Sequence, residues 1–201
     1  MKRKGNIKNH VSHLLFSICL FILLSFAFCL CGCGGDKDKA KQLVISGERI
    51  LISLKSDSEN FTKGFTDVQK LLESQKQISS TEISARLNMM DESAKRIVSG
   101  YIKARKEFSK VLGLKGVTDY ANYSELRIKG LEKLTELTEK TLNYLHFVEE
   151  IVVRQEKGEE VDPVESFTRI QQFAKAFDQL SKEVDKLAED ANDLRKEKRL
   201  F

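Results

Sequence analysis

The stretch ISARLNMMDESAKRIVSGYIKARKEFSKV, residues 83–111, decides the fold that the sequence predicts. Its apolar side chains recur at every third or fourth residue, and charged or polar side chains fill most positions between them. This spacing is typical of an α-helix that buries one face, because residues three and four apart lie on the same side of a helix. The predicted core positions are Ile83, Leu87, Met90, Ala94, Ile97, Tyr101, Ala104, Phe108 and Val111.

Three further runs have the same spacing, at about residues 37–77, 119–157 and 163–198. The polar sequence SDSEN, residues 56–60, interrupts the first run, so we expect a bend there. The predicted core positions are Leu43, Val44, Ile50, Leu54, Phe61, Phe65, Val68 and Leu72 in the first run, Tyr123, Leu131, Leu134, Leu137, Thr141, Leu145, Val148 and Val152 in the next, and Phe167, Ile170, Phe173, Phe177, Leu180, Val184, Leu187, Ala191 and Leu194 in the last.

Helix-start and helix-stop residues separate the four runs. SSTE at 79–82 and DPVE at 162–165 match capping boxes, and the second also places a proline in the first turn. Gly113 is expected to take the left-handed conformation after the second run, with Leu114 as its hydrophobic partner, and Gly158 to close the third run. Short turns between long helices predict antiparallel neighbours.

The sequence therefore predicts an all-α protein, an elongated antiparallel four-helix bundle over residues 37–201. The single proline and the abundance of Lys, Glu, Leu and Ala favour helix over sheet. At 1.5 Å per residue, the helices would be about 45–60 Å long. The alternative is an intermolecular coiled coil, which several consecutive heptads would also suit.

The first 33 residues have a different character. Lys2, Arg3, Lys4 and Lys8 precede an uncharged apolar stretch, residues 14–30. A basic start followed by an apolar stretch and small residues is the layout of a secretory signal, and an uncleaved signal anchor is the alternative. In either case, the residues beyond 33 are expected outside the cytoplasm, because the positive flank stays inside.

The tetrapeptide LCGC, residues 30–33, resembles the lipobox of bacterial lipoproteins. Leu30 stands three residues before the modified cysteine and the small residue Gly32 directly before it, while Cys31 replaces the more usual Ala or Ser. The resemblance implies a signal peptide over residues 1–32, cleavage between Gly32 and Cys33, and a diacylglycerol on Cys33. Residues 33–36 then form the lipidated N-terminus and a short linker.

Cysteine and charge counts exclude several classes of protein. All four cysteines lie at or before Cys33, so a disulfide framework and a cysteine metal site are not expected in the processed chain. The whole chain has 34 basic and 30 acidic residues, and the four basic ones in the leader leave 30 of each after it. Nucleic-acid binding thus has no support from charge.

The helical part offers little catalytic chemistry, and neither enzyme activity, a metal nor a cofactor is expected. Its one histidine, His146, precedes Glu149 and Glu150, which we interpret as a histidine beside surface carboxylates. The Phe167, Phe173 and Phe177 stripe is expected in the core. Tyr120 and Tyr123 are the best candidates for exposed aromatic residues, and together with Asn122 they could form a contact patch.

Basic residues gather near two places that an antiparallel bundle brings to the end where the first helix begins. They are candidates for contact with anionic lipid head groups, although basic residues also match the helix macrodipole at C-termini. The opposite end would carry Glu156, Glu159, Glu160, Asp162 and Glu165. The candidate contact residues are Lys110, Lys115, Arg195, Lys196, Lys198 and Arg199, with Arg105 and Lys106 nearby.

These observations predict a lipid-anchored helical protein of the bacterial cell envelope with a structural or protein-interaction role and an unidentified protein partner. The alternative is a sensory or small-ligand-binding bundle. A filled core with an exposed apolar stripe would favour the first role, and an apolar cavity with convergent polar groups the second. Gly34, in place of the Asp that retains Gram-negative lipoproteins in the inner membrane, points to the outer membrane in such a host.

Overall fold

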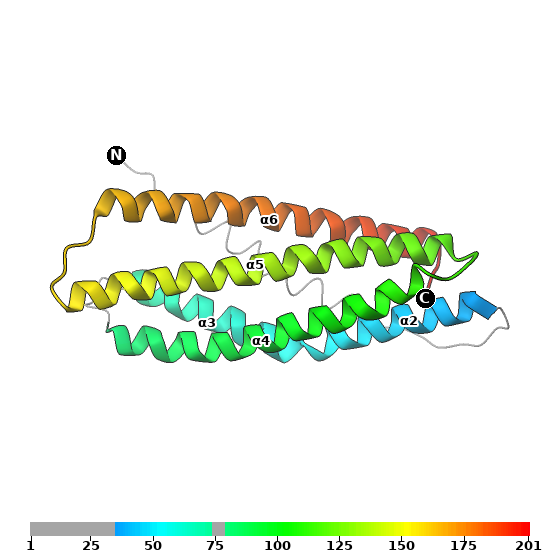
Figure 1. The fold of residues 1–201 in the computed structure, drawn as a ribbon, viewed down its shortest axis with the longest axis horizontal. Helices are drawn as coiled ribbons and strands as arrows, with labels where there is room; N and C mark the ends of the chain where they lie inside the picture. Colours follow the sequence, from blue (N-terminus) through cyan, green and yellow to red (C-terminus); the bar gives the residue numbers. More distant parts are fainter. Residues whose placement is uncertain (1–34, 74–78) are drawn as a thin grey trace.

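A computed structural model describes residues 35–73 and 79–201, and the regular structure in these residues is entirely α-helical. Figure 1 shows an elongated antiparallel arrangement of four helices, the first of which is bent into α2 and α3. This confirms the predicted all-α, four-helix fold. None of the described helices is long and apolar enough to cross a membrane. The helices are α2 (Gly35–Ser53), α3 (Lys55–Glu73), α4 (Ser80–Val111), α5 (Thr118–Glu156) and α6 (Pro163–Glu197).

The bend in the first helix lies at Leu54, just before the polar stretch where it was predicted. The Ser53 hydroxyl donates a hydrogen bond to the Ile50 carbonyl oxygen at 2.6 Å. The Leu54 amide instead donates to the carbonyl of Leu51, three residues back, at 3.1 Å. A serine hydroxyl that takes a carbonyl from the backbone ladder bends a helix, and this explains the position of the bend.

The core forms around α4, whose nine predicted core positions are all buried. One flank of α4 packs against α2 and α3, and the other flank packs against α5. Gly47 of α2 lets the backbone approach the Phe108 ring, because a Cβ atom there would lie 2.7 Å from Phe108 Cζ. Full burial of a side chain such as Phe108 stabilises the fold by about 1.5–3 kcal/mol.

The predicted helix ends are partly confirmed. Asp162 caps α6 by accepting hydrogen bonds from the amides of Val164 and Glu165, and Pro163 occupies the first turn. Gly158, at φ 70°, ends α5 with the paired backbone hydrogen bonds of a Schellman motif.

Two end predictions are wrong. Ser79 precedes α4 in an extended conformation but makes no side-chain cap. Glu156, at the end of α5, accepts instead from the Ser80 amide at 2.8 Å and the Ser80 hydroxyl at 2.5 Å, so a neighbouring helix caps α4. After α4, Gly116 rather than Gly113 has positive φ, because α4 ends at Val111 in a tight turn and the chain reverses later.

The last helix, α6, lies along α5 at one edge of the molecule, with α5 between it and α4 (Figure 1). In the described part of the chain, no Cα atom of α6 lies within 8 Å of one in α2, α3 or α4. Side chains bridge the wider gap where the Phe65 and Phe177 rings stack with centroids 6.5 Å apart. The first half of α6 thus packs mainly against α5, on one side only. The prediction that Phe167 and Ile170 are buried is wrong, because both side chains are exposed.

Candidate functional site

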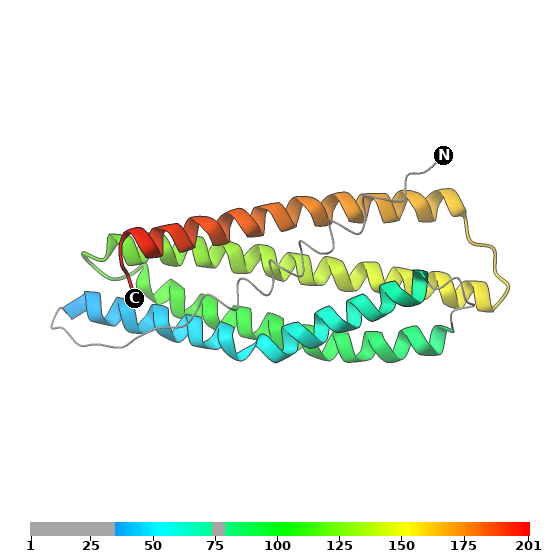
Figure 2. The ribbon, with the colours of Figure 1, turned by 180° about the vertical axis from the view of Figure 1, so that it is seen from behind.

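The two ends of the molecule differ in charge. Figure 2 shows the start of α2, the turn between α4 and α5, and the C-terminus together at one end. We call this the basic end. The Lys115 amide donates a hydrogen bond to Asp36 Oδ2 at 3.1 Å, and Tyr120 Oη donates to the Leu200 carbonyl at 2.5 Å. These two bonds hold the three segments together.

The structure brings the six predicted basic contact residues to this end. Lys110 pairs with Glu107, and Lys198 with Glu197 at 2.8 Å. Arg195 lies over the Phe201 ring, 5.6 Å from its centroid. The remaining three predicted side chains, those of Lys115, Lys196 and Arg199, are exposed.

The C-terminal residues are fixed in place rather than trailing from α6. Arg199, at φ 49°, occupies the left-handed position of a second Schellman motif, in which the Leu200 amide donates to the Arg195 carbonyl at 3.2 Å. Leu200 is buried, and the Phe201 ring packs edge-on against Tyr123 with centroids 5.4 Å apart. The basic side chains of residues 195–199 therefore extend from a stretch of backbone whose end packs against the core.

A buried polar network behind this end was not predicted. The Glu48 carboxylate of α2 accepts from Tyr123 Oη at 2.8 Å and from Arg127 Nη2 at 2.7 Å. Burial alone would lower the pKa of Arg127, but Glu48 and the neighbouring tyrosines outweigh it and raise that pKa. Tyr120 and Tyr123 do not form the exposed contact patch for which they were candidates, because their hydroxyls bond internally and their rings join the core. Tyr123 instead occupies the core position that the spacing of its run predicted.

A sequence feature could have revealed this network. Glu48 stands four residues after Val44 and three before Leu51, and Arg127 stands four after Tyr123. A charged residue at a core position of a helix stripe indicates a buried pair, because an unpaired charge there is too costly.

His146 bridges α4 and α5 at the surface. Its Nδ1 lies 3.3 Å from Glu149 Oε2 and its Nε2 lies 3.3 Å from Asp91 Oδ1, with 45% of its side chain exposed. Glu149 was predicted as a neighbour, whereas Asp91 comes from α4 and was missed. Among the described residues, no three His, Cys, Asp or Glu side chains are arranged to hold a metal ion.

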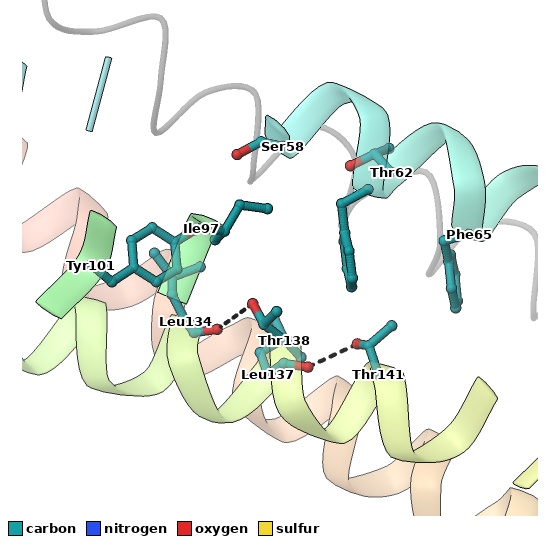
Figure 3. Close-up of a pocket in the computed structure, with 10 residues that line it drawn as sticks. Ser58, Thr62, Phe65, Ile97, Tyr101, Leu134, Leu137, Thr138 and Thr141 are labelled. Atoms are coloured by element: carbon teal, nitrogen blue, oxygen red, sulfur yellow. Dashed lines mark hydrogen bonds between the residues drawn. The ribbon is translucent and has the colours of Figure 1, made fainter. Parts of the chain in front are cut away.

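A small cavity lies between α3, α4 and α5 (Figure 3). Its volume of about 30 Å³ is enough to hold water, for which roughly 10–15 Å³ suffices, but is far below the roughly 300–1,000 Å³ of ligand pockets. Two of its hydroxyls, those of Thr138 and Thr141, donate to the carbonyls of Leu134 and Leu137 at 2.8 Å each. Its walls are Ser58, Phe61, Thr62, Phe65, Ile97, Tyr101, Leu134, Leu137, Thr138 and Thr141.

The opposite end of the molecule is acidic and carries exposed apolar side chains. The turn and first residues of α6, residues 156–165, contain five acidic residues and one basic residue. We call this the acidic end. Next to it, Val164, Phe167 and Ile170 of α6 are 72%, 61% and 37% exposed. We call these three residues the α6 apolar face.

Comparisons with protein-family models, curated proteins and solved structures found no match to this chain. The predicted signal peptide, residues 1–32, and the predicted lipidation residue Cys33 lie outside the described residues, as does Gly32 at the predicted cleavage point. The features that bear on function are therefore the sequence before residue 35 and the geometry of the helices after it.

Proposed function

We propose that this chain is a lipoprotein of the bacterial cell envelope, held in a membrane by lipid on Cys33 and facing outside the cytoplasm. The lipobox-like sequence at residues 30–33 supports the anchor. One structural observation joins this anchor to the helices: α2 begins at Gly35, two residues after Cys33, and its start lies at the basic end. A lipid on Cys33 would place that end at the bilayer.

The basic end then meets the membrane surface. A well-placed basic side chain contributes about 1 kcal/mol of attraction to anionic head groups, which is about fivefold in affinity. Lys115, Lys196 and Arg199 are exposed for this contact, and Leu112 beside them is an exposed apolar residue. The competing explanation is that these residues only match the macrodipoles of α4 and α6.

A protein-interaction role fits the helical body better than a ligand-binding role. The cavity between α3, α4 and α5 has room only for water. Two larger hollows, of about 550 Å³ between α3 and α4 and about 760 Å³ between α5 and α6, are open to solvent and lined mainly by polar and charged side chains, unlike the mostly apolar, enclosed lining of a typical small-molecule site. The α6 apolar face, in contrast, is a row of three apolar side chains exposed on one helix. Such a row is typical of a surface that contacts a protein partner.

Metabolic labelling with an alkyne-bearing fatty acid tests the anchor. Wild-type chain should be labelled and found in membranes, and Cys33→Ala should lose the label. Cys31→Ala is the matched control and should keep it, because Cys31 is not the predicted acceptor. Label that persists in Cys33→Ala would contradict the lipobox interpretation. If the host has two membranes, fractionation should place the labelled protein in the outer one.

Vesicle binding separates the membrane contact from dipole matching. Residues 34–201, made without leader or lipid, should bind vesicles that contain phosphatidylglycerol. Neutralising Arg195, Lys196, Lys198 and Arg199 to Gln should weaken that binding by at least about fivefold. The matched control neutralises the exposed residues Lys103, Lys129, Lys175 and Lys186 on the sides of the helices. Equal binding by both variants would leave the macrodipole as the explanation.

A further inference from the structure

We propose that the turn between α4 and α5 enters the bilayer at Leu112 and gives the molecule a second attachment beside the lipid. We call residues 112–116, with the sequence LGLKG, the insertion turn. This inference rests on the proposed lipid anchor and names the part of the basic end that meets the acyl chains. Three observations carry it: the tether from Cys33, the exposed leucine, and the charges beside it.

A hydrogen bond ties the insertion turn to the part of the chain that follows the proposed lipid. The Lys115 amide donates to Asp36 Oδ2 at 3.1 Å. Asp36 follows Cys33 by three residues, so their Cα atoms are at most about 11 Å apart. A lipid on Cys33 therefore keeps the insertion turn at the level of the head groups. Apolar side chains of peripheral proteins reach about 5–10 Å into the boundary with the acyl chains from there.

Leu112 supplies the exposed apolar side chain at this end. It is 43% exposed, whereas Leu114, Leu200 and Phe201 pack in or against the core. The other large apolar side chains that are exposed among the described residues, such as Ile102, lie along the helices or toward the acidic end. A single exposed leucine is ordinary on a protein surface, so the position of Leu112 beside the tether is what gives it meaning.

The charges around the insertion turn suit an anionic surface. Lys110 and Lys115 are exposed, and residues 108–118 contain no acidic residue. Of the nearby carboxylates, Glu107 pairs with Lys110, and Asp36 accepts from the Lys115 amide. A leucine between lysines can enter the bilayer while the long lysine side chains keep their ammonium groups among the head groups. The insertion turn thus adds an apolar contact to the electrostatic contact of the basic end.

Tryptophan placement tests the insertion, because the chain contains no tryptophan of its own. The lipidated protein carries Leu112→Trp, Ile102→Trp or Val164→Trp, each of which replaces an exposed apolar side chain. Each variant is added to vesicles of phosphatidylcholine and phosphatidylglycerol with bromine on the acyl chains. Bromine should quench the fluorescence of Leu112→Trp strongly and leave the other two unquenched. Equal quenching of all three variants, or none at position 112, would overturn the proposal.

Trypsin gives an independent measure, because the turns at the two ends contain matched peptide bonds. Lys115 precedes Gly116 and Lys157 precedes Gly158, and both glycines have φ of 70°. On vesicles, the wild-type protein should be cleaved more slowly after Lys115 than after Lys157.

The substitution Leu112→Gln should speed cleavage after Lys115 by roughly fivefold and leave cleavage after Lys157 unchanged. Insertion takes the exposed 43% of the Leu112 side chain out of water, and a fivefold shift is roughly the size of that effect. The matched control, Ile102→Gln, should change neither rate. Because both replaced side chains are exposed, both variants should keep the wild-type circular dichroism. An unchanged rate in Leu112→Gln, or the same change in Ile102→Gln, would contradict the insertion.

Flotation of the vesicles separates this inference from the lipid anchor. Wild type and Leu112→Gln should both float with the vesicles, since the acyl chains on Cys33 carry the attachment. A chain that does not float would refute the anchor and the insertion together. A chain that floats but is not quenched at position 112 would refute the insertion alone.

Discussion

Arg127→Met would leave the Glu48 carboxylate buried between α2 and α5 without its cation. That carboxylate lies 2.7 Å from Arg127 Nη2, 2.7 Å from Arg127 Nε and 2.8 Å from Tyr123 Oη. The Arg127 and Glu48 side chains are 6% and 9% exposed, so water cannot replace the lost partner. Removal of one member of a buried ion pair destabilises a protein by about 3–5 kcal/mol. We expect a loss of that size in the free energy of unfolding.

Urea denaturation followed by circular dichroism measures this loss. Glu48→Leu should cost a similar amount, and Glu48→Leu/Arg127→Met should regain most of it, because an apolar pair of similar volume can replace a buried ion pair. Arg105→Met is the matched control: its guanidinium pairs with Glu132 at the surface, and it should cost no more than about 1 kcal/mol. If the double variant lost the sum of the two single losses, the pairing would not be the source of the effect.

Three further predictions concern packing, hydrogen bonding and pH. Gly47→Ala should lower the urea midpoint, because its Cβ would lie 2.7 Å from the Phe108 ring and overpacking of about 1–3 kcal/mol exceeds the gain in helix propensity of about 1 kcal/mol. Ser124→Ala should raise the free energy of unfolding by about 1 kcal/mol, since the buried Ser124 hydroxyl has no hydrogen-bond partner in the described part of the chain. Hydrogen bonds from Ser80 lower the pKa of Glu156, so its stabilising effect is present above the usual carboxyl pKa of about 4.3 and is lost as pH falls through the lowered value. The midpoint difference between wild type and Glu156→Gln should therefore shrink in acid, and a difference that stays constant from neutral pH to about pH 3 would refute this cap.

The sequence predicted the helices because their periodicity is local. In residues 83–111, the spacing alone identifies the buried face, and every predicted core position there is buried. The same holds for the third run, from Tyr123 to Val152. The bend was predicted within a few residues, since a polar interruption of the apolar stripe is visible in the sequence.

The features that the sequence did not predict depend on contacts between helices. The capping of Ser80 by Glu156 joins residues 76 positions apart, and no local pattern predicts it. Likewise, Phe167 has the spacing of a core residue, but its exposure follows from how far α6 stands from α3. The basic end was predicted because short turns fix the helix order, which in turn fixes which termini lie together.

The orientation of the molecule on the membrane tests the central claim most directly. Residues 34–201 contain no cysteine, and lipid would occupy Cys33, so a single introduced cysteine can carry a fluorophore. The labels Lys115→Cys and Lys157→Cys mark the basic and acidic ends of the natively lipidated protein, reconstituted in vesicles with quencher-bearing head groups. We predict strong quenching at position 115 and none at position 157, about 58 Å away along α5. Equal quenching at the two positions, or quenching at 157 alone, would contradict a molecule anchored by its basic end.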